Sequence, residues 1–298
     1  MTTKPILAVG SIALDTIETP QGQRQEILGG SATFFSIASS LFAPVRLVGV
    51  VGSDYPEEGW RLFRERGIDV SDVQQVAGST FRWGGRYSRD LSERETLFTH
   101  LGVFENFQPL VSNGNRRTGI IYLGNIQPSL QLAVCEHMTA ARRIISDTMN
   151  LWIDMNREEL EAVLGKTHIF LINDEEASQL TGHDDLEAAA HWLLRAGPST
   201  VVIKRGHKGA FLATDGTHKH IPVYPHSRLV DPTGAGDSFA GGFIGHIANH
   251  DESHIEEAVI RGAATASFTV EDFGLEGLLR ATPEGVEHRM ENIRDLMD

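Results

Sequence analysis

The sequence predicts a three-layer α/β/α fold with a mostly parallel central sheet and a small β-lid. Apolar runs of strand length recur between segments that have helical periodicity. These runs are continuous rather than alternating, as expected of strands that helices cover on both faces. Two polar stretches without a helical stripe, at 12–28 and 78–108, interrupt the pattern. They are the segments from which the lid is predicted.

Strands and helices are expected to alternate through the first two thirds of the chain. Buried strands are expected at residues 6–9, 46–51, 120–123, 143–145, 169–172 and 200–203. Helices are expected at about 31–42, 56–66, 129–141, 156–164 and 185–196. A strand followed by a helix, repeated several times, is typical of parallel sheets whose crossover connections are helical.

The two polar stretches are expected to form half-exposed strands outside the main sheet. The second stretch places arginine and aromatic side chains around Gly84 and Gly85, namely Arg82, Trp83, Arg86, Tyr87 and Arg89. Two ordinary surface hairpins are the alternative. We therefore treat residues 1–298 as one domain with lid segments at about 12–28 and 78–108.

The C-terminal part of the chain is expected to be helical. From residue 237 onward an apolar stripe recurs at every fourth residue, formed by Phe239, Phe243 and Ile247. Thr282 followed by Pro283 is typical of an N-cap and the first position of a helix. A last helix is therefore expected to run to about Leu296.

Composition excludes several classes of protein. The net charge of −14 argues against a nucleic-acid partner, because counterion release from phosphates requires a basic face. Cys135 is the only cysteine, which rules out an internal disulfide and a cysteine-rich zinc site. The apolar run that ends at Asp15 is too short to span a membrane and lacks a signal-peptide cleavage pattern. We expect a cytoplasmic protein.

Segment 231–242, Asp-Pro-Thr-Gly-Ala-Gly-Asp-Ser-Phe-Ala-Gly-Gly, is the most informative part of the sequence. A strand at 228–230 is expected to run into a glycine turn, which an amphipathic helix follows. Glycines in the turn let backbone amides converge on an anion, and the helix N-terminus adds partial positive charge. Asp237 is then either an N-cap or a proton acceptor beside a phosphoryl group. The segment alone leaves both interpretations open.

This segment resembles the C-terminal signature Asp-Thr-x-Gly-Ala-Gly-Asp of the ribokinase (PfkB-type) carbohydrate and nucleoside kinase family. The Gly-Ala-Gly-Asp core matches in full. The resemblance implies a ribokinase-like fold with Asp237 as the general base. It also implies an anion hole formed by the amides of Gly234, Ala235 and Gly236. Asp231 and Thr233 would be the ligands of a monovalent cation such as K⁺.

Further matches follow in the family's order along nearly the whole chain. Gly29 and Gly30 before a helix, and then residues 48–54, resemble the N-terminal signature. Residues 173–176 fit the Asn-x-x-Glu motif, and residues 204–209 fit the Thr-x-Gly-x-x-Gly nucleotide segment. The resemblance implies ATP and Mg²⁺ as cofactors, with an indirect role for Glu176 in placing Mg²⁺. Nucleotide contacts would come from Asn173, Lys204, Gly206 and Gly209.

Each of these matches also has a local structural explanation. Asn173 could cap a helix that begins at Asp174, and Glu176 would then be an acid favoured by the helix dipole. Gly206 and Gly209 could form a hairpin turn. Only the joint order of the matches favours the family over a set of unrelated turns.

Asp15 follows the first strand, at the carboxyl edge where open α/β sheets bind ligands. A carboxylate can accept hydrogen bonds from two hydroxyls, so Asp15 suits a polyol, although a solvated turn acid is the alternative. In the family an acidic residue here binds the substrate, which implies the same role for Asp15 with Gly29 and Gly30.

Two positions depart from the family pattern. Where many members carry Asn, this chain has Thr33-Phe34-Phe35, and Phe34 is expected to pack against a base or an apolar part of the substrate. Lys204 replaces the usual Thr or Ser and is expected to contact a phosphate as a point charge.

Together these residues predict an ATP-dependent kinase that phosphorylates a primary hydroxyl of a small sugar or nucleoside. A non-catalytic small-molecule-binding or regulatory protein of the same fold is the alternative. Retention of Asp237 and the complete Gly-Ala-Gly turn disfavours that alternative. The arginine and aromatic side chains of the lid suit either a cover over the substrate or a homodimer contact between two lids.

Overall fold

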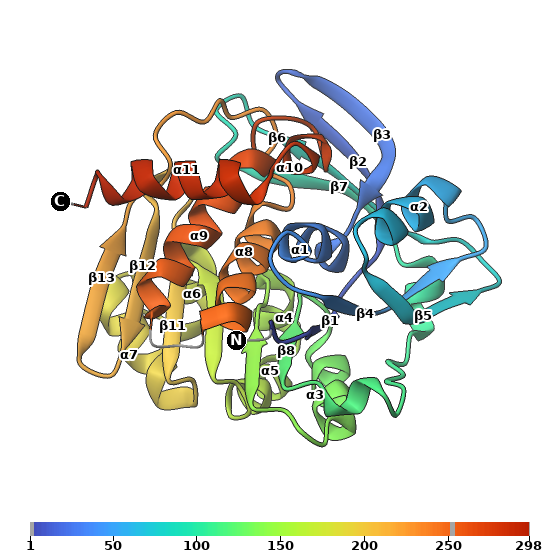
Figure 1. The fold of residues 1–298 in the computed structure, drawn as a ribbon, viewed down its shortest axis with the longest axis horizontal. Coiled ribbons are helices and arrows are strands. Elements are labelled where there is room, and N and C mark those ends of the chain that lie inside the picture. Colours follow the sequence, from blue (N-terminus) through green and yellow to red (C-terminus); the bar gives the residue numbers. More distant parts are fainter. Residues whose placement is uncertain (1–2, 251–253, 298) are drawn as a thin grey trace.

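The computed structural model describes residues 3–250 and 254–297. A large sheet lies at the centre, and a smaller sheet stands at one end of it (Figure 1). The large sheet contains β1 (Ile6–Val9), β4 (Val45–Gly52), β5 (Asp69–Val76), β8 (Ile120–Leu123), β9 (Arg143–Ser146), β10 (Ile169–Asn173), β11 (Thr200–Lys204), β12 (Ala210–Thr214) and β13 (Thr217–Ile221). The smaller sheet contains β2 (Ala13–Thr19), β3 (Gly22–Gly29), β6 (Phe81–Tyr87) and β7 (Arg94–His100).

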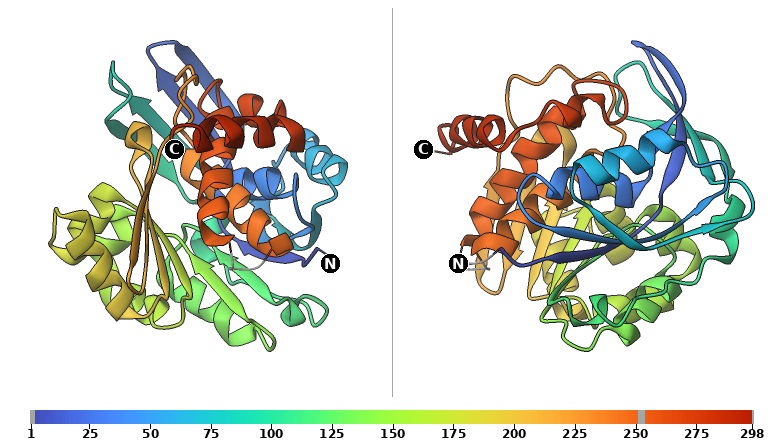
Figure 2. Two further views of the ribbon diagram at one scale, coloured as in Figure 1. Left: turned by 60° about the vertical axis from the view of Figure 1, so that its left-hand side comes forward. Right: turned by 45° about the vertical axis from the view of Figure 1, so that its right-hand side comes forward.

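Helices cover both faces of the large sheet (Figures 1 and 2). One face carries α1 (Ser31–Ser39), α2 (Glu57–Glu65), α8 (Ala235–His250), α9 (Ile255–Thr269), α10 (Glu276–Leu279) and α11 (Pro283–Arg294). The other face carries α3 (Pro128–His137), α4 (Asn150–Met155), α5 (Arg157–Leu164), α6 (Asp174–Thr181) and α7 (Leu186–Ala196). The three-layer arrangement is the one that the sequence predicts.

The order of the large sheet is β13-β12-β11-β10-β9-β8-β1-β4-β5. From β5 to β11 all neighbouring strands are parallel, whereas β12 and β13 add an antiparallel edge. Parallel strands end at the same edge of the sheet, so the residues that follow β1, β8, β9, β10 and β11 are brought together.

Alternation along each central strand explains the continuous apolar runs in the sequence. In β1, Ile6 and Ala8 pack under α1 and α8, while Leu7 and Val9 pack toward α3. In β10, Ile169 lies in the first of these clusters and Phe170 lies against α5 to α7. A strand with helices on both faces therefore needs apolar side chains at every position.

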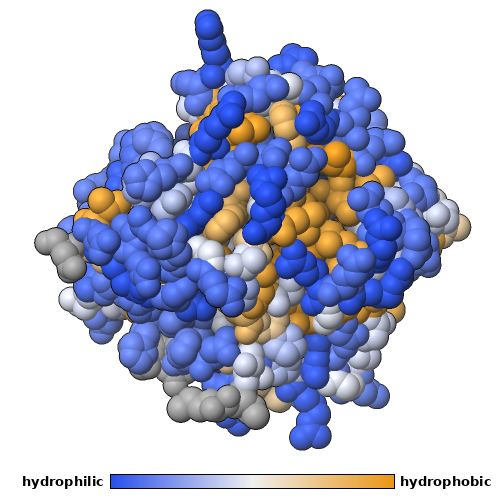
Figure 3. Space-filling view, turned by 45° about the horizontal axis from the view of Figure 1, so that its top comes forward, coloured by the Kyte–Doolittle hydropathy of each residue, from blue (hydrophilic) through white to orange (hydrophobic). Residues whose placement is uncertain are grey.

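The smaller sheet has the order β3-β2-β6-β7 and combines strands from two distant parts of the chain. Strands β2 and β6 are parallel, with Asp15 opposite Trp83 and Glu18 opposite Arg86. On the outer face Arg86 donates to Glu18 at 2.7 Å. On the inner face Ile17 packs with residues of the loops around α8 and α9, forming a cluster with Val230 and Phe273. Figure 3, seen from this end of the molecule, shows a band of apolar side chains between hydrophilic flanks.

The strand expected at residues 228–230 is not formed. The amides of Val230 and Asp231 both donate to the carbonyl of Val270, at 2.7 and 3.3 Å. A strand requires a partner that continues along its length, and here two successive amides share one acceptor. The segment is an irregular connection into α8, and its Leu229 is 40% exposed.

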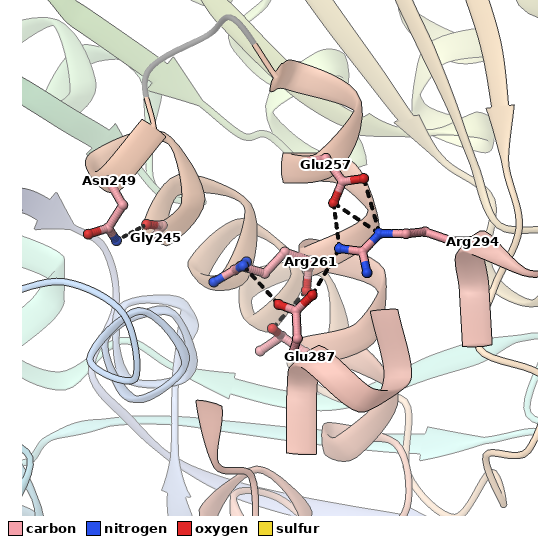
Figure 4. A network of polar contacts seen from close by, with 7 residues as sticks. Gly245, Asn249, Glu257, Arg261, Glu287 and Arg294 are labelled. Atoms are coloured by element: carbon pink, nitrogen blue, oxygen red, sulfur yellow. Dashed lines mark hydrogen bonds and ion pairs between the residues drawn. The ribbon is translucent and has the colours of Figure 1, made fainter. Parts of the chain in front are cut away.

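A network of charged side chains joins the last helix to α9 (Figure 4). Arg294 donates to Glu257 at 2.7 Å and to Glu287 at 2.9 Å, and Arg261 donates to Glu287 at 3.2 Å. Thr282 caps α11 by accepting from the amide of Gly285, as its sequence predicts.

Within residues 3–250 and 254–297, no helix combines the length and apolar character needed to cross a membrane.

Close packing of α8 against α1 depends on glycine. A Cβ on Gly241 would lie 2.5 Å from the Ala38 Cβ and 2.7 Å from the Phe35 carbonyl oxygen. The two helices can approach to this distance only because residue 241 has no side chain. The N-terminus of α8 is thereby held against the layer that carries α1.

We expect Gly241→Ala to lower the urea midpoint of unfolding. Overpacking costs about 1–3 kcal/mol, which outweighs the gain of about 1 kcal/mol that alanine brings within a helix. Gly114→Ala is the matched control, because no heavy atom lies within 4 Å of a Cβ at residue 114 and its φ is −64°. Equal midpoints for the two variants would contradict the proposed packing constraint.

Candidate active site

Most of the polar residues predicted from the sequence to form the site lie at the carboxyl edge of the large sheet. Asn173 ends β10 and Lys204 ends β11, and these two residues are partners in the parallel register. Asp147 directly follows β9, and Asp237 lies in the first turn of α8. The arrangement follows from the parallel topology, in which ligand sites form outside the carboxyl ends of the strands.

A buried ion pair lies at the centre of this edge. The Lys204 ammonium is 2.7 Å from a carboxylate oxygen of Asp147, with the two side chains 16% and 6% exposed. Burial by itself would lower the pKa of Lys204, but the carboxylates of Asp147 and Glu176 raise it above its ordinary value. Lys204 is therefore a fixed positive charge inside the site.

The same ammonium lies beside the glycine turn. A Cβ on Gly236 would be 3.2 Å from the Lys204 nitrogen. Lys204 thus connects the strand edge to the segment that the sequence identified as an anion site. An anion at the turn would meet both the ammonium and the N-terminus of α8.

The turn itself presents two amides that have no acceptor. Among the residues that the structure describes, the amides of Gly234 and Gly236 donate to no atom, whereas the amide of Ala235 donates to the Pro232 carbonyl at 3.2 Å. Gly234 has a φ of +74°, a conformation that glycine adopts without strain. Of the three amides predicted for the anion hole, two are available in this conformation and Ala235 is engaged.

Phe34 is placed differently from its expected contact with a substrate. Its side chain is 1% exposed, and its ring lies so close to the turn that a Cβ on Gly234 would be 2.3 Å from it. Phe34 is enclosed by protein and supports the glycine turn from the side of α1. The structure therefore does not place Phe34 where a substrate could reach it.

Asp237 has a perturbed pKa. Burial, followed by the nearby carboxylate of Asp147, raises its pKa to about 7, although Lys204 and its own backbone amide act in the opposite direction. A carboxyl group with this pKa can take up a proton near neutral pH, which an ordinary surface aspartate does poorly.

Asp15 lies on β2 and is 4% exposed. One of its oxygens accepts from the Gly30 amide at 3.3 Å, and a Cβ on Gly29 would lie 1.9 Å from that oxygen. Burial raises the pKa of Asp15 to about 7, and the Gly30 amide opposes this shift while Asp231 and Asp237 add to it. Asp237 therefore lies near enough to Asp15 to contribute to the shift of its pKa.

Asp231 is fully buried and anchors the loop before α8. One oxygen accepts from the Thr233 amide and the other from the Gly274 amide, each at 2.9 Å. Burial raises its pKa, and within the described residues no cationic side chain pairs with it. The Thr233 hydroxyl in turn lies 2.9 Å from the Tyr87 hydroxyl, which joins the small sheet to this loop.

Asn173 and Glu176 form a capping box at the start of α6. The Asn173 side chain accepts from the Glu176 amide at 2.7 Å, and the Glu176 carboxylate accepts from the Asn173 amide at 3.1 Å. Burial and Asp147 raise the pKa of Glu176 to about 7, while Lys204 lowers it. The local capping role is therefore present, at a position that interacts with the rest of the site.

Gly206 and Gly209 lie in the turn between β11 and β12. Both have positive φ values, +52° and +82°, and the Arg205 amide donates to the Gly209 carbonyl at 2.8 Å. The hairpin considered from the sequence is thus formed. No heavy atom lies within 4 Å of a Cβ on Gly206, so the turn is open on that side.

Two site residues were not identified from the sequence. Asp147 follows a strand at the same edge as Asp15, so the rule that singled out Asp15 would also have found it. Arg94, on β7, lowers the pKa of Asp237 and Glu176, but no sequence pattern distinguishes it from other surface arginines.

Within the described ranges, no three His, Cys, Asp or Glu side chains are grouped so as to hold a metal ion.

Comparison with known proteins gives a match over most of the chain. The sequence model of the pfkB family carbohydrate kinases matches residues 3–280. The cytidine kinase of Thermococcus kodakarensis is 29% identical over 276 residues, which cover 90% of this chain and 97% of the relative.

Solved structures show the same fold. The putative ribokinase II of E. coli in complex with ATP and Mg²⁺ has a TM-score of 0.80 at 20% identity, covering 97% of this chain and 99% of that one. The nucleoside kinase of Burkholderia thailandensis in complex with inosine has a TM-score of 0.79 at 20% identity, covering 97% and 98%. At these identities the two structures establish the fold alone. They confirm the ribokinase-like architecture predicted from the sequence.

The raised pKa values of the site carboxyls predict how stability depends on pH. Asp15, Glu176 and Asp237 have folded-state pKa values of about 7, above the 3.8 to 4.5 of free side chains. Between those limits the folded state binds more protons than the unfolded state, so these groups reduce stability as the pH rises from about 4 to 7. Above pH 7 these groups continue to lower the free energy of unfolding by the full amount.

We expect Asp237→Asn to make the ligand-free protein more stable than wild type at pH 8 and to flatten the decline between pH 5 and pH 8. Urea unfolding at both pH values measures the effect. Asp215→Asn, in the exposed turn between β12 and β13, is the matched control for loss of one charge. Identical pH slopes for Asp237→Asn and Asp215→Asn would show that the Asp237 carboxyl ionises normally in the folded protein.

Proposed function

The chain belongs to the pfkB family of carbohydrate kinases, and on that premise we propose that it transfers the γ-phosphoryl group of ATP to a primary hydroxyl of a small sugar or nucleoside. The observation that carries the proposal is the position of Asp237. Its carboxyl group, with a pKa raised to about 7, lies beside two amides of a glycine turn at a helix N-terminus, and these amides donate to no atom of the described residues. A base and an anion site are thereby combined within one turn of α8.

In the proposed reaction the acceptor hydroxyl oxygen attacks the γ-phosphorus in line with the bridging oxygen. The new oxygen–phosphorus bond forms as the bond from the γ-phosphorus to the bridging oxygen breaks, and ADP leaves. Asp237 takes the hydroxyl proton. The amides of Gly234 and Gly236, with the α8 N-terminus, stabilise negative charge on the transferring group.

Lys204 and its neighbours are proposed to hold the phosphates of the nucleotide. The Lys204 ammonium already lies beside Gly236, so a phosphate at the turn would share it with Asp147. Asn173, Gly206 and Gly209 are assigned to nucleotide contacts, and Gly206 borders open space. When bound, Mg²⁺ would supply charge neutralisation on the ATP phosphates, and the half-buried carboxylate of Glu176 would help to place it indirectly.

Asp15 is proposed to bind the acceptor. Its carboxylate lies on the small sheet, interacts electrostatically with Asp237, and can accept from hydroxyls of a sugar ring. The tight approach of Gly29 and Gly30 fixes its orientation. The small sheet is proposed to act as the lid that excludes water, which would otherwise compete for the phosphoryl group.

Nucleosides and sugars both remain acceptors within this proposal. The relative from Thermococcus kodakarensis is named a cytidine kinase, and the structure from Burkholderia thailandensis contains inosine. These names support a nucleoside as the first acceptor to be tried. A test should therefore include cytidine, inosine, D-ribose and common hexoses with Mg·ATP.

We expect ADP formation with at least one of these acceptors, and we expect Asp237→Asn to reduce kcat by about 10²–10⁴-fold, the usual contribution of a general base. ATP affinity should change little, because the amides and Lys204 are retained. Asp215→Asn is the matched control and should keep wild-type turnover. A variant Asp237→Asn that binds ATP and retains most of its activity would refute the assigned base.

We also propose that Asp231 and Thr233 belong to a site for a monovalent cation. The fully buried Asp231 carboxylate has amide donors but no cationic side chain among the described residues, so its charge is poorly compensated, and a bound K⁺ would supply the missing charge. The amide of Thr233 is already held by Asp231, so a cation here would also stabilise the loop before α8.

Activity is expected to be several-fold higher in KCl than in choline chloride at equal ionic strength. Asp231→Asn should lose this difference, whereas Asp215→Asn should preserve it. Equal rates for the wild-type enzyme in both salts would argue against the cation site while leaving the role of Asp237 untouched.

A further inference from the structure

One aromatic side chain of the small sheet has no structural role in the apolar core. Trp83 is half-buried on β6 and, in the part of the chain that the structure describes, belongs to none of the four apolar clusters. Its indole N–H donates to no described residue. A large aromatic ring that is neither packed in a core nor hydrogen-bonded is available for contact with a ligand.

The strand register places Trp83 on the face of the small sheet that looks into the site. Trp83 is the partner of Asp15 in the parallel pairing of β2 and β6, and partners in neighbouring strands point to the same side. Tyr87 lies on this face too, since its hydroxyl reaches Thr233 in the loop before α8. The outer face is occupied by the ion pair between Arg86 and Glu18.

The orientation of the indole depends on the residue two positions away. A Cβ on Gly85 would lie 2.1 Å from the far edge of the Trp83 ring, so the ring lies over Gly85 and could not do so over any other residue. The Arg94 guanidinium is 5.4 Å from the ring centre, within range of a cation–π contact. Gly85 and Arg94 thus hold the ring in one position on the face of the small sheet that carries Asp15.

We propose that Trp83 is a stacking platform for the base of a nucleoside acceptor, whose ribose hydroxyls bind to Asp15. This inference rests on the proposed function and specifies its substrate class. Neighbouring strands lie about 4.8 Å apart, so a ribose held by Asp15 places its base within reach of the indole. A base offers a flat π face to the ring, whereas a free sugar offers none.

Binding measurements without ATP test the platform independently of turnover. Calorimetric titration with cytidine, inosine and D-ribose should be performed on the wild type, Trp83→Ala and Trp83→Phe. We expect Trp83→Ala to weaken nucleoside binding by about tenfold or more, with D-ribose binding unchanged. Trp83→Phe should restore most of the nucleoside affinity, because an aromatic face is retained.

Tryptophan fluorescence provides a second measurement and a matched control. Nucleoside binding should quench the wild-type signal, and the quenching should be lost in Trp83→Phe. Trp192→Phe, on α7 at the opposite side of the large sheet, should keep both the quenching and the affinity. The control separates an effect of Trp83 from the general removal of a tryptophan.

The outcomes separate this inference from the kinase assignment. Nucleoside binding that survives Trp83→Ala unchanged, equal loss of nucleoside and D-ribose binding, or failure of the wild type to bind any nucleoside would overturn the platform, even if the enzyme forms ADP with a sugar. Trp83-dependent nucleoside binding without ADP formation would overturn the proposed reaction and leave the platform standing.

Discussion

The ion pair between Lys204 and Asp147 is the interaction on which the site depends. Three strand ends and the first turn of α8 bring carboxylates together in a region with little solvent, where uncompensated charges would be costly. The Lys204 ammonium interacts with Asp147, Glu176 and Asp237 together, and the last two still have pKa values near 7. The parallel sheet supplies the positions, and the Lys204 ammonium, with a smaller contribution from Arg94, offsets the negative charges that folding brings together.

Most of the large sheet could be predicted from the sequence because a strand between two helical layers must be apolar at every position. That signal fails at the edges. Strand β5 has the sequence Asp-Val-Ser-Asp-Val-Gln-Gln-Val and reads as a polar segment, since only β4 pairs with it. The prediction of a strand at residues 228–230 failed for the opposite reason, because apolar residues there do not form a strand. Two apolar residues, Leu229 and Val230, suggested a strand, but they carry no information about whether a neighbouring strand exists.

Some residues of the site are positioned by the local sequence, and others are positioned by tertiary packing. The glycine turn and the capping box at Asn173 follow from short segments whose backbone conformation is set locally. Asp147 could have been found by applying the rule for strand ends consistently. Phe34 and Arg94 could not be placed, because the first depends on how α1 meets the turn and the second on the pairing of β6 with β7. The role of the small sheet and any contact between two copies of the chain stay predictions.

In the proposed reaction, one feature of the small sheet would link binding of the acceptor to its enclosure. Asp15 is carried by β2, a strand of that sheet, and β3 leads through Gly29 and Gly30 directly into α1. Under the role proposed for Asp15, the acceptor would be bound to the small sheet that covers it and not to the large sheet. Any movement of the sheet toward α8 would transport the bound molecule along with it. In the proposed reaction, delivery of the acceptor to the γ-phosphorus and closure of the small sheet would be a single displacement, which would limit hydrolysis of ATP when no acceptor is present.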